Sequence, residues 1–206
     1  MLDLRTALRR CPIAAILRGV KPDEIDAIGD ALVEAGVTVI EVPLNSPNPF
    51  ESIARLAARH GARALIGAGT VLESADVARV AQAGGRLMVA PNFDADVVRA
   101  AKAAGLATLP GVMTPSEGFA ALKAGADGLK LFPAEIIPPA VFKAWRAVFP
   151  ADTLLLAVGG VGIGNIGTYA QAGASGYGIG SALYKPGRPA AEIGRLARAL
   201  VQAAKA

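Results

Sequence analysis

Short apolar runs and amphipathic segments alternate along this chain with a period of about 20–25 residues. Most of the amphipathic segments end in a small residue followed by glycine, and an apolar run follows directly. Glycine at that place supplies the left-handed residue with which many helices end. The pattern therefore predicts helices that end at Gly36, Gly61, Gly84, Gly105, Gly125 and Gly173, with Pro150 in place of glycine at one further stop.

The apolar runs predict eight short strands. They cover residues 13–17, 39–42, 64–67, 87–90, 107–109, 129–131, 154–158 and 176–179. These runs are almost continuously apolar, as expected for parallel strands that are covered on both faces. Eight strand–helix units predict an α/β fold, a single (β/α)8 TIM barrel that spans residues 1–206 as one domain. A flavodoxin-like doubly wound sheet would need fewer units and longer connections.

The beginning of the chain predicts a short N-terminal helix over residues 2–10, with Leu4 and Leu8 on one face. Arginines followed by apolar residues imitate the start of a signal peptide, but the apolar run is too short, lacks a cleavage site and ends at Arg18. We interpret that run as the first strand. Pro22 predicts the start of the next helix, because proline is favoured in a first turn. No run of about 18 apolar residues is present, so we expect no membrane span.

The composition predicts a large core and a small anionic partner. Of the 206 residues, 53% are hydrophobic and 18% are charged, with a formal net charge of +4. The arginines occur at helical spacing, as in Arg55/Arg59 and Arg195/Arg198, which we interpret as solvated helix faces. Nucleic acid is therefore not an expected partner, whereas the mild positive excess favours an anionic small substrate. Cys11 is the only cysteine, which is typical of a reducing compartment such as the cytoplasm.

The active site of such a barrel lies at the carboxyl ends of its strands. The residues there are Arg18, Glu41, Thr70, Pro91-Asn92, Pro110-Gly111, Lys130, Gly159-Gly160 and Gly180-Ser181. This set holds one acid, one lysine and one arginine. The single histidine, His60, stands at a helix end, where we expect a helix-end cation or a surface residue. No group of several histidine and carboxylate ligands can be assembled, so we expect neither a metal nor another cofactor.

Glycine-rich turns follow the seventh and eighth predicted strands, at residues 159–161 and 178–181. Glycine lets backbone N–H groups approach an anion, and phosphate-binding barrels hold their phosphate at these two turns. The alternative is that the turns serve the backbone alone. Residues 162–167 also fit G-x-G-x-x-G, but no acid stands about 20 residues further on, so we do not expect a dinucleotide site.

Lys130 stands inside an apolar strand, and Glu41 is the single acid at a strand end. Two interpretations are open: a buried structural ion pair, or an amine nucleophile with a proton shuttle. Burial can lower a lysine pKa by up to about 3–5, and the free amine is the form that attacks a carbonyl. Arg18 would lower the same pKa, and ionised Glu41 would raise it. An acid beside the amine can carry the protons that imine formation requires.

Seven segments together resemble the class I (Schiff-base) pyruvate aldolases that act on 2-keto-3-deoxy-6-phosphogluconate and -6-phosphogalactonate. They are residues 16–19, 40–47, 66–72, 110–111, 129–133, 158–161 and 180–181, in register across nearly the whole chain. Asn45-Ser46, Pro91-Asn92 and residues 158–161 resemble the phosphogalactonate members of that family, with the phosphogluconate enzymes as the alternative.

The resemblance implies that Lys130 forms an iminium ion with the C2 ketone and that Glu41 shuttles protons. It implies roles in substrate binding for Arg18 and Thr70 at the carboxylate, for Gly160, Gly180 and Ser181 at the phosphate, and for Phe132 and Pro91 as walls. The implied substrate is a phosphorylated sugar acid, 2-dehydro-3-deoxy-6-phospho-D-galactonate, cleaved to pyruvate and D-glyceraldehyde 3-phosphate by a homotrimer. The rivals are a different phosphate-binding barrel enzyme, such as an epimerase, and a non-catalytic phosphate-binding protein.

Overall fold

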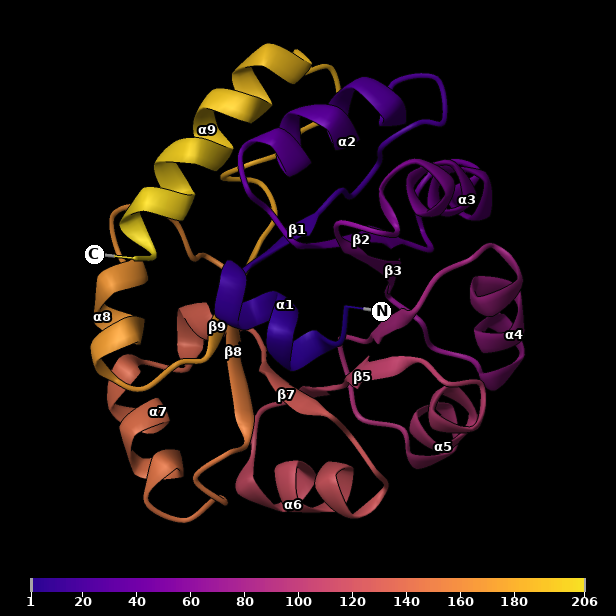
Figure 1. Cartoon of the computed structure of the whole chain (residues 1–206). Helices are drawn as coiled ribbons and strands as arrows, with labels where there is room; N and C mark the ends of the chain where they lie inside the picture. The colour runs from indigo at the N-terminus through magenta and orange to yellow at the C-terminus, as the bar shows by residue number, and fades with distance from the viewer. Residues whose placement is uncertain (1, 206) are drawn as a thin grey trace.

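Strands and helices alternate in the computed structural model, which describes residues 2–205. The strands are β1 (Ile13–Ile16), β2 (Val39–Pro43), β3 (Leu65–Gly69), β4 (Leu87–Val89), β5 (Ala107–Leu109), β6 (Gly111–Val112), β7 (Gly128–Leu131), β8 (Leu154–Val158) and β9 (Gly176–Ile179). The α-helices are α1 (Leu4–Arg10), α2 (Ile25–Glu34), α3 (Pro49–His60), α4 (Ser74–Gln82), α5 (Ala95–Ala103), α6 (Pro115–Lys123), α7 (Pro139–Arg146), α8 (Ile166–Gln171) and α9 (Ala190–Ala203), and η1 (Ala134–Ile136) is a short 3₁₀ helix. Helices α2 to α9 surround the strands as an outer ring (Figure 1). Within residues 2–205, no helix combines the length and the apolar character needed to cross a bilayer.

Neighbouring strands pair in parallel, in the order β5-β4-β3-β2-β1-β9-β8-β7-β6. β5 matches the fifth predicted strand, and β6 extends it beyond Pro110, which has no N–H to donate. The carbonyl of Pro110 still accepts a 2.9 Å hydrogen bond from the Lys130 N–H, so the ring closes between this strand and β7. The predicted (β/α)8 barrel is confirmed, with its fifth strand in two pieces.

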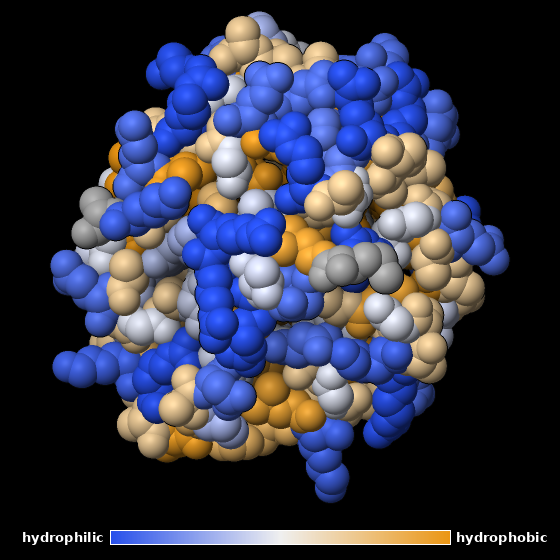
Figure 2. All heavy atoms as spheres, viewed as in Figure 1, coloured by the Kyte–Doolittle hydropathy of each residue, from blue (hydrophilic) through white to orange (hydrophobic). Residues whose placement is uncertain are grey.

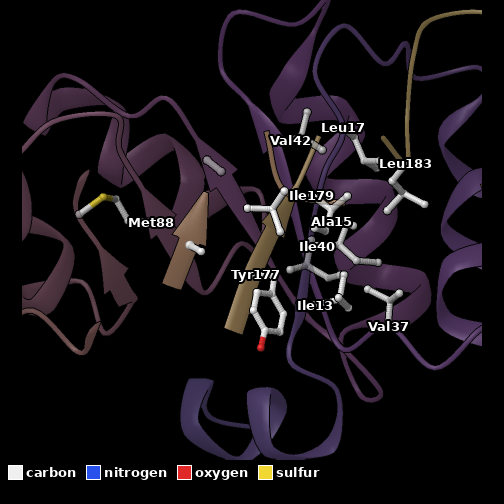
Figure 3. Packing of buried hydrophobic residues seen from close by; sticks show 14 of the residues in the cluster. Ile13, Ala15, Leu17, Val37, Ile40, Val42, Met88, Tyr177, Ile179 and Leu183 are labelled. Carbon is white, nitrogen blue, oxygen red and sulfur yellow. The ribbon is translucent and has the colours of Figure 1, made fainter. Parts of the chain in front are cut away.

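Alternate residues of each strand belong to two apolar clusters. Ile13, Ala15 and Leu17 pack outward against the helices (Figure 3). Ala14 and Ile16 point into the barrel, where they line a small interior cavity with residues of the other strands. Successive side chains of a strand leave on opposite faces. Any polar side chain at an inward strand position is therefore held in an apolar interior.

Helix α1 closes the amino-terminal end of the barrel. Leu4 and Leu8 belong to the inner cluster together with residues at the start of strands, such as Leu154. Asp3 accepts a 2.8 Å hydrogen bond from the Thr6 N–H, which caps the helix and makes it begin at Leu4 instead of at residue 2. The helix lies across the ring in Figure 1, and the same face is largely hydrophilic in Figure 2. The carboxyl ends of the strands therefore open on the opposite side.

The predicted role of glycine at helix ends is confirmed at five positions and wrong at one. Gly36, Gly84, Gly105, Gly125 and Gly173 all have left-handed backbones. Gly61 instead has a φ of −59°, because the chain continues in a right-handed turn beyond α3. A side chain at Gly61 would overlap the carbonyl oxygen of Ala57, so close backbone approach, and not a positive φ, is the reason for glycine there.

The second helix begins later than predicted. Pro22 lies in a turn that precedes α2, and the helix starts at Ile25. The Glu24 carboxylate accepts a 3.1 Å hydrogen bond from the Lys21 N–H, which closes this turn on itself. Proline therefore marks the beginning of a turn that leads into the helix at Ile25.

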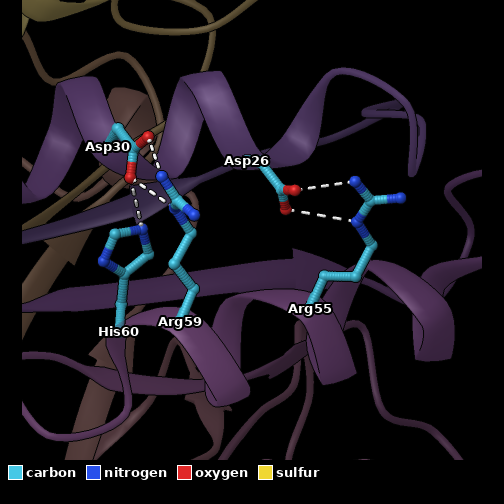
Figure 4. A network of polar contacts seen from close by, with 5 residues as sticks. All are labelled: Asp26, Asp30, Arg55, Arg59 and His60. Carbon is cyan, nitrogen blue, oxygen red and sulfur yellow. Dashed lines mark hydrogen bonds and ion pairs between the residues drawn. The ribbon is translucent and has the colours of Figure 1, made fainter.

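The arginines of α3 do not form a purely solvated helix face. Arg55 and Arg59 each make a two-pronged ion pair, with Asp26 and Asp30 of α2 respectively (Figure 4). His60 is 4% exposed, and its Nε2 lies 3.2 Å from Asp30 Oδ1. Burial lowers the His60 pKa, so the expectation of a helix-end cation or a surface residue is wrong. Helical spacing in the sequence shows which residues share a face, but not that α2 packs against it.

Candidate active site

Lys130 occupies an inward position at the carboxyl half of β7. Its neighbours Leu129 and Leu131 belong to the outer cluster, so strand alternation turns the lysine into the barrel. The side chain is 5% exposed, and Nζ lies 4.7 Å from the centroid of the Phe132 ring. Burial lowers the pKa of the Lys130 amine, the positive charge of Arg18 adds to that effect, and Glu41 opposes it. The amine is thus driven toward the neutral, nucleophilic form.

Glu41 occupies the corresponding inward position of β2, where it is 2% exposed. Burial raises the pKa of the Glu41 carboxyl to about 7, against the opposing effect of Lys130 and then of Arg18. Its Oε2 has no hydrogen-bond partner among residues 2–205. Glu41 and Lys130 therefore influence each other through the electrostatic interaction of their charges. The unpartnered Oε2 can form a hydrogen bond with a bound molecule.

A glycine on the neighbouring strand makes room for this carboxyl. A side chain at Gly69, the last residue of β3, would overlap the carboxylate of Glu41. In the sequence, Gly69 stood out only as a member of residues 66–72, one of the segments that resemble the aldolase family. Its contact with Glu41 could not be read from the sequence, because the two residues lie on different strands.

Arg18 and Thr70 are brought together at the ends of β1 and β3. Arg18 donates a 2.7 Å hydrogen bond from Nη1 to Asn45 Oδ1 and a 3.4 Å bond from Nη2 to Thr70 Oγ1. Thr70 has a φ of 55°, a rare and strained conformation for a β-branched residue that often marks a functional site. The N–H of Gly19 donates to Ser46 Oγ at 2.9 Å. Asn45 and Ser46, known from the sequence only as subfamily markers, therefore hold the end of β1 in place.

The predicted phosphate-end residues share a cavity with the lysine. A cavity of about 460 Å³ is lined by Arg18, Lys130, Phe132, Glu135, Gly159, Gly160, Gly180, Ser181 and Lys185, among others. Glu41 and Lys130 line the smaller interior cavity beneath it. Pro91 lines neither of these two cavities, and its carbonyl lies instead against Gly111 of β6.

Two charged residues of this cavity were missed by the sequence reasoning. Lys185 lies on the loop after β9, four positions beyond Ser181, and its place after the eighth predicted strand could have suggested it. Glu135 lies on η1, directly after β7. A side chain at Gly159 or Gly160, both with positive φ, would overlap Glu135, so the glycine turn fits closely around this acid.

Asn165 shapes the turn after β8. Its Oδ1 accepts a 2.9 Å hydrogen bond from the Gly162 N–H, and its Nδ2 donates a 2.9 Å bond to the Gly160 carbonyl. Asn165, which belongs to the G-x-G-x-x-G segment, therefore makes hydrogen bonds within its own loop.

In the part of the chain that the structure describes, no three His, Cys, Asp or Glu side chains are grouped as a metal would need.

The family described as KDPG and KHG aldolase matches residues 4–194. The chain belongs to the KDPG and KHG aldolase family. It is therefore an aldolase, a carbon–carbon lyase of a family whose aldolases are class I and metal-independent.

Relatives within the KDPG and KHG aldolase family match almost the whole chain. A protein of Rhizobium meliloti (strain 1021), named probable 2-dehydro-3-deoxy-6-phosphogalactonate aldolase, is 50% identical and covers 93% of this chain and 91% of its own. The 2-dehydro-3-deoxy-6-phosphogalactonate aldolase of Escherichia coli (strain K12) is 42% identical, with 94% and 95% covered. A solved structure described as native KDPGal has a TM-score of 0.93 and 42% identity over 94% of each chain.

Proposed function

We propose that this aldolase cleaves 2-dehydro-3-deoxy-6-phospho-D-galactonate to pyruvate and D-glyceraldehyde 3-phosphate through a Schiff base on Lys130. The observation that carries the proposal is the pair of buried ionisable groups inside the barrel. Burial lowers the pKa of the Lys130 amine and raises that of the Glu41 carboxyl, so the uncharged form of each group is favoured. A nucleophile and a proton carrier are then available at the same pH.

Imine formation uses both groups. The neutral Lys130 amine attacks the C2 ketone, and the resulting carbinolamine loses water to give an iminium ion. Glu41 delivers the proton that turns the C2 oxygen into a leaving water. The apolar interior supports this step, because it disfavours the ammonium form of the lysine before the attack.

Cleavage reverses the direction of proton flow. Ionised Glu41 takes the proton of the C4 hydroxyl, the C3–C4 bond breaks, and its electron pair moves to the iminium nitrogen. D-glyceraldehyde 3-phosphate leaves and an enamine remains on Lys130. Protonation of the enamine carbon and addition of water release pyruvate and regenerate the free amine.

The two ends of the substrate are held by different loops. Arg18, positioned by Asn45 and Thr70, binds the carboxylate. The turns at Gly160, Gly180 and Ser181 bind the phosphate, and Lys185 adds a positive charge to that end of the cavity. Phe132 forms a wall beside the amine. Pro91 remains a predicted wall residue, supported by its place after β4 alone.

The preference for the phosphogalactonate substrate is supported by two features. The relatives named for that substrate are 50% and 42% identical to this chain. Asn45 and Ser46, which mark that subfamily, contact Arg18 and Gly19 at the proposed carboxylate end. 2-Dehydro-3-deoxy-6-phosphogluconate is the alternative substrate.

A homotrimer in the cytoplasm completes the proposal. The trimer is supported by the family resemblance and by large apolar side chains that are exposed in the isolated chain, among them Phe119, Ile136, Val148 and Ile163. The cytoplasmic location is supported by the free thiol of Cys11.

Reduction with borohydride in the presence of pyruvate tests the Schiff base. We expect one reduced pyruvate adduct, located on Lys130 by peptide mass analysis, because the buried amine forms an iminium that hydride reduces to a stable secondary amine. The Lys130→Met variant serves as the control and should acquire no adduct. Folded wild-type protein that stays unmodified at Lys130 would rule out this mechanism.

The pH dependence of cleavage tests the role of Glu41. Imine formation needs a neutral Lys130 amine together with a protonated Glu41, whose pKa is raised to about 7. The value of kcat/KM should therefore pass through a maximum with pH: it rises as Lys130 loses its proton and falls as Glu41 loses its own. Glu41→Gln should lower turnover by roughly 10²–10⁴-fold and abolish the falling limb. A folded Glu41→Gln protein with wild-type turnover would show that Glu41 has a structural role only.

Initial rates on the two phosphorylated sugar acids test the substrate preference. We expect a higher kcat/KM for the phosphogalactonate compound, and Asn45→Ala should weaken binding of both substrates because Arg18 loses its 2.7 Å partner. A higher kcat/KM for the phosphogluconate compound would assign the enzyme to the other subfamily.

A further inference from the structure

Two loops that each carry a residue of the cavity, Arg18 and Lys185, are joined by one long-range hydrogen bond. Tyr184, on the loop after β9, donates its hydroxyl to Glu24 Oε1 at 2.6 Å. The two residues are 160 positions apart in the sequence. Tyr184 is 3% exposed, so the bond is shielded from competing water. The same carboxylate also accepts from the Lys21 N–H, which fixes its position within the loop after β1.

A second contact shows that the loops are closely fitted. Gly19, next to Arg18, has a φ of +85°, and a side chain there would lie 3.1 Å from Pro186 Cγ. Pro186 belongs to the same loop as Tyr184. The loop after β1 therefore rests directly on the loop after β9, with glycine at the point of contact.

The two loops carry the two proposed ends of the substrate site. Arg18 begins the first loop, whereas Ser181 and Lys185 belong to the second. The hydrogen bond between Tyr184 and Glu24 therefore joins the carboxylate end of the cavity to its phosphate end.

The first loop is held to the loop after β2 by hydrogen bonds of its own. Among residues 2–205, the Tyr184 bond is the one hydrogen bond that joins the second loop to another loop, although Leu183 and Tyr184 are buried in the core. Arg18 is held by Asn45, and the Gly19 N–H by Ser46. In the second loop, the other hydrogen bonds of the segment are internal. They run from the N–H groups of residues 183 and 184 to the Gly180 carbonyl, and from Arg188 to residues 183 and 185. Losing the Tyr184 hydroxyl should therefore loosen the phosphate end more than the carboxylate end.

We propose that Tyr184 is a positioning residue whose hydrogen bond to Glu24 sets the distance between the carboxylate end and the phosphate end of the substrate site. The inference rests on the proposed aldolase function and adds a specificity device to it. The bond favours substrates that carry both charged ends, because it holds the loop of Ser181 and Lys185 at the separation that such a substrate needs.

Tyr184→Phe tests this role, because it removes the hydroxyl and keeps the ring. Aldol addition of pyruvate to D-glyceraldehyde 3-phosphate is compared with addition to unphosphorylated D-glyceraldehyde. We expect the ratio of the two kcat/KM values to fall about tenfold, the size expected for one hydrogen bond to a charged group, mainly through KM of the phosphorylated aldehyde. Deuterium exchange at the pyruvate methyl group, which involves no phosphate, should stay within about twofold of wild type.

Matched variants separate positioning from general destabilisation. Tyr177→Phe removes the hydroxyl of another buried tyrosine, on β9 (Figure 3), and should leave the ratio unchanged. Glu24→Gln keeps an oxygen acceptor and should behave nearly as wild type, whereas Glu24→Ala should reproduce the effect of Tyr184→Phe. The double variant should lose no more than either single variant.

Two results would overturn the inference. One is an unchanged ratio in folded Tyr184→Phe and Glu24→Ala proteins. The other is an equal loss of the aldol reaction with both aldehydes and of pyruvate exchange, which is the sign of a structural role only. If wild-type protein catalysed no pyruvate exchange, the Schiff-base function itself would be rejected, and the inference with it. That outcome is distinct because it is seen before any variant is made.

Discussion

Keeping an amine and a carboxyl inside an apolar barrel is the constraint on which the rest of this structure depends. Both Lys130 and Glu41 stand at inward strand positions that apolar side chains occupy elsewhere in the ring. Removing a charged group from water is costly unless the group is neutralised or paired. The barrel interior therefore lowers the pKa of the Lys130 amine and raises that of the Glu41 carboxyl, so that both groups favour their uncharged forms. The unfavourable burial of these groups thereby makes them reactive: a neutral amine can attack a ketone, and a carboxyl near its pKa can both donate and accept a proton.

The surrounding parts of the fold serve this pair. Helix α1 covers the opposite end of the barrel with leucines, whereas the cavity that contains Lys130 lies at the carboxyl ends of the strands. Gly69 leaves space for the Glu41 carboxylate, and the glycines at 159 and 160 let the turn after β8 fit against Glu135. Arg18 and Lys185 place positive charge at two sides of the cavity, on two loops that Tyr184 joins. An aldolase that recognises both ends of an anionic substrate is consistent with this division.

Much of the fold could be predicted from the sequence, because each helix end and each strand has a local cause. Glycine with a positive φ ends five helices, and apolar runs mark the strands. The failures concern relations between elements. Periodicity placed His60 at a helix end but could not show that α2 buries it. Similarly, glycine is required at position 61 because the Ala57 carbonyl oxygen leaves no room for a side chain. Likewise Lys130, Glu41 and the glycine turns were found as strand-end residues, whereas Lys185 and Glu135 were missed because they stand a few residues further along the loops that follow the strands.

The protonation of Lys130 is the quantity that tests the central claim most directly. Lysine side chains labelled with ¹³C at Cε can be titrated by NMR, with the Lys130→Met protein used to assign the signal. Burial predicts a Lys130 pKa below the ordinary value of a lysine amine, and Glu41→Gln should lower it further because the opposing charge is removed. A Lys130 pKa at or above the ordinary value would show that the buried groups form a stable ion pair, and it would contradict the proposed nucleophile.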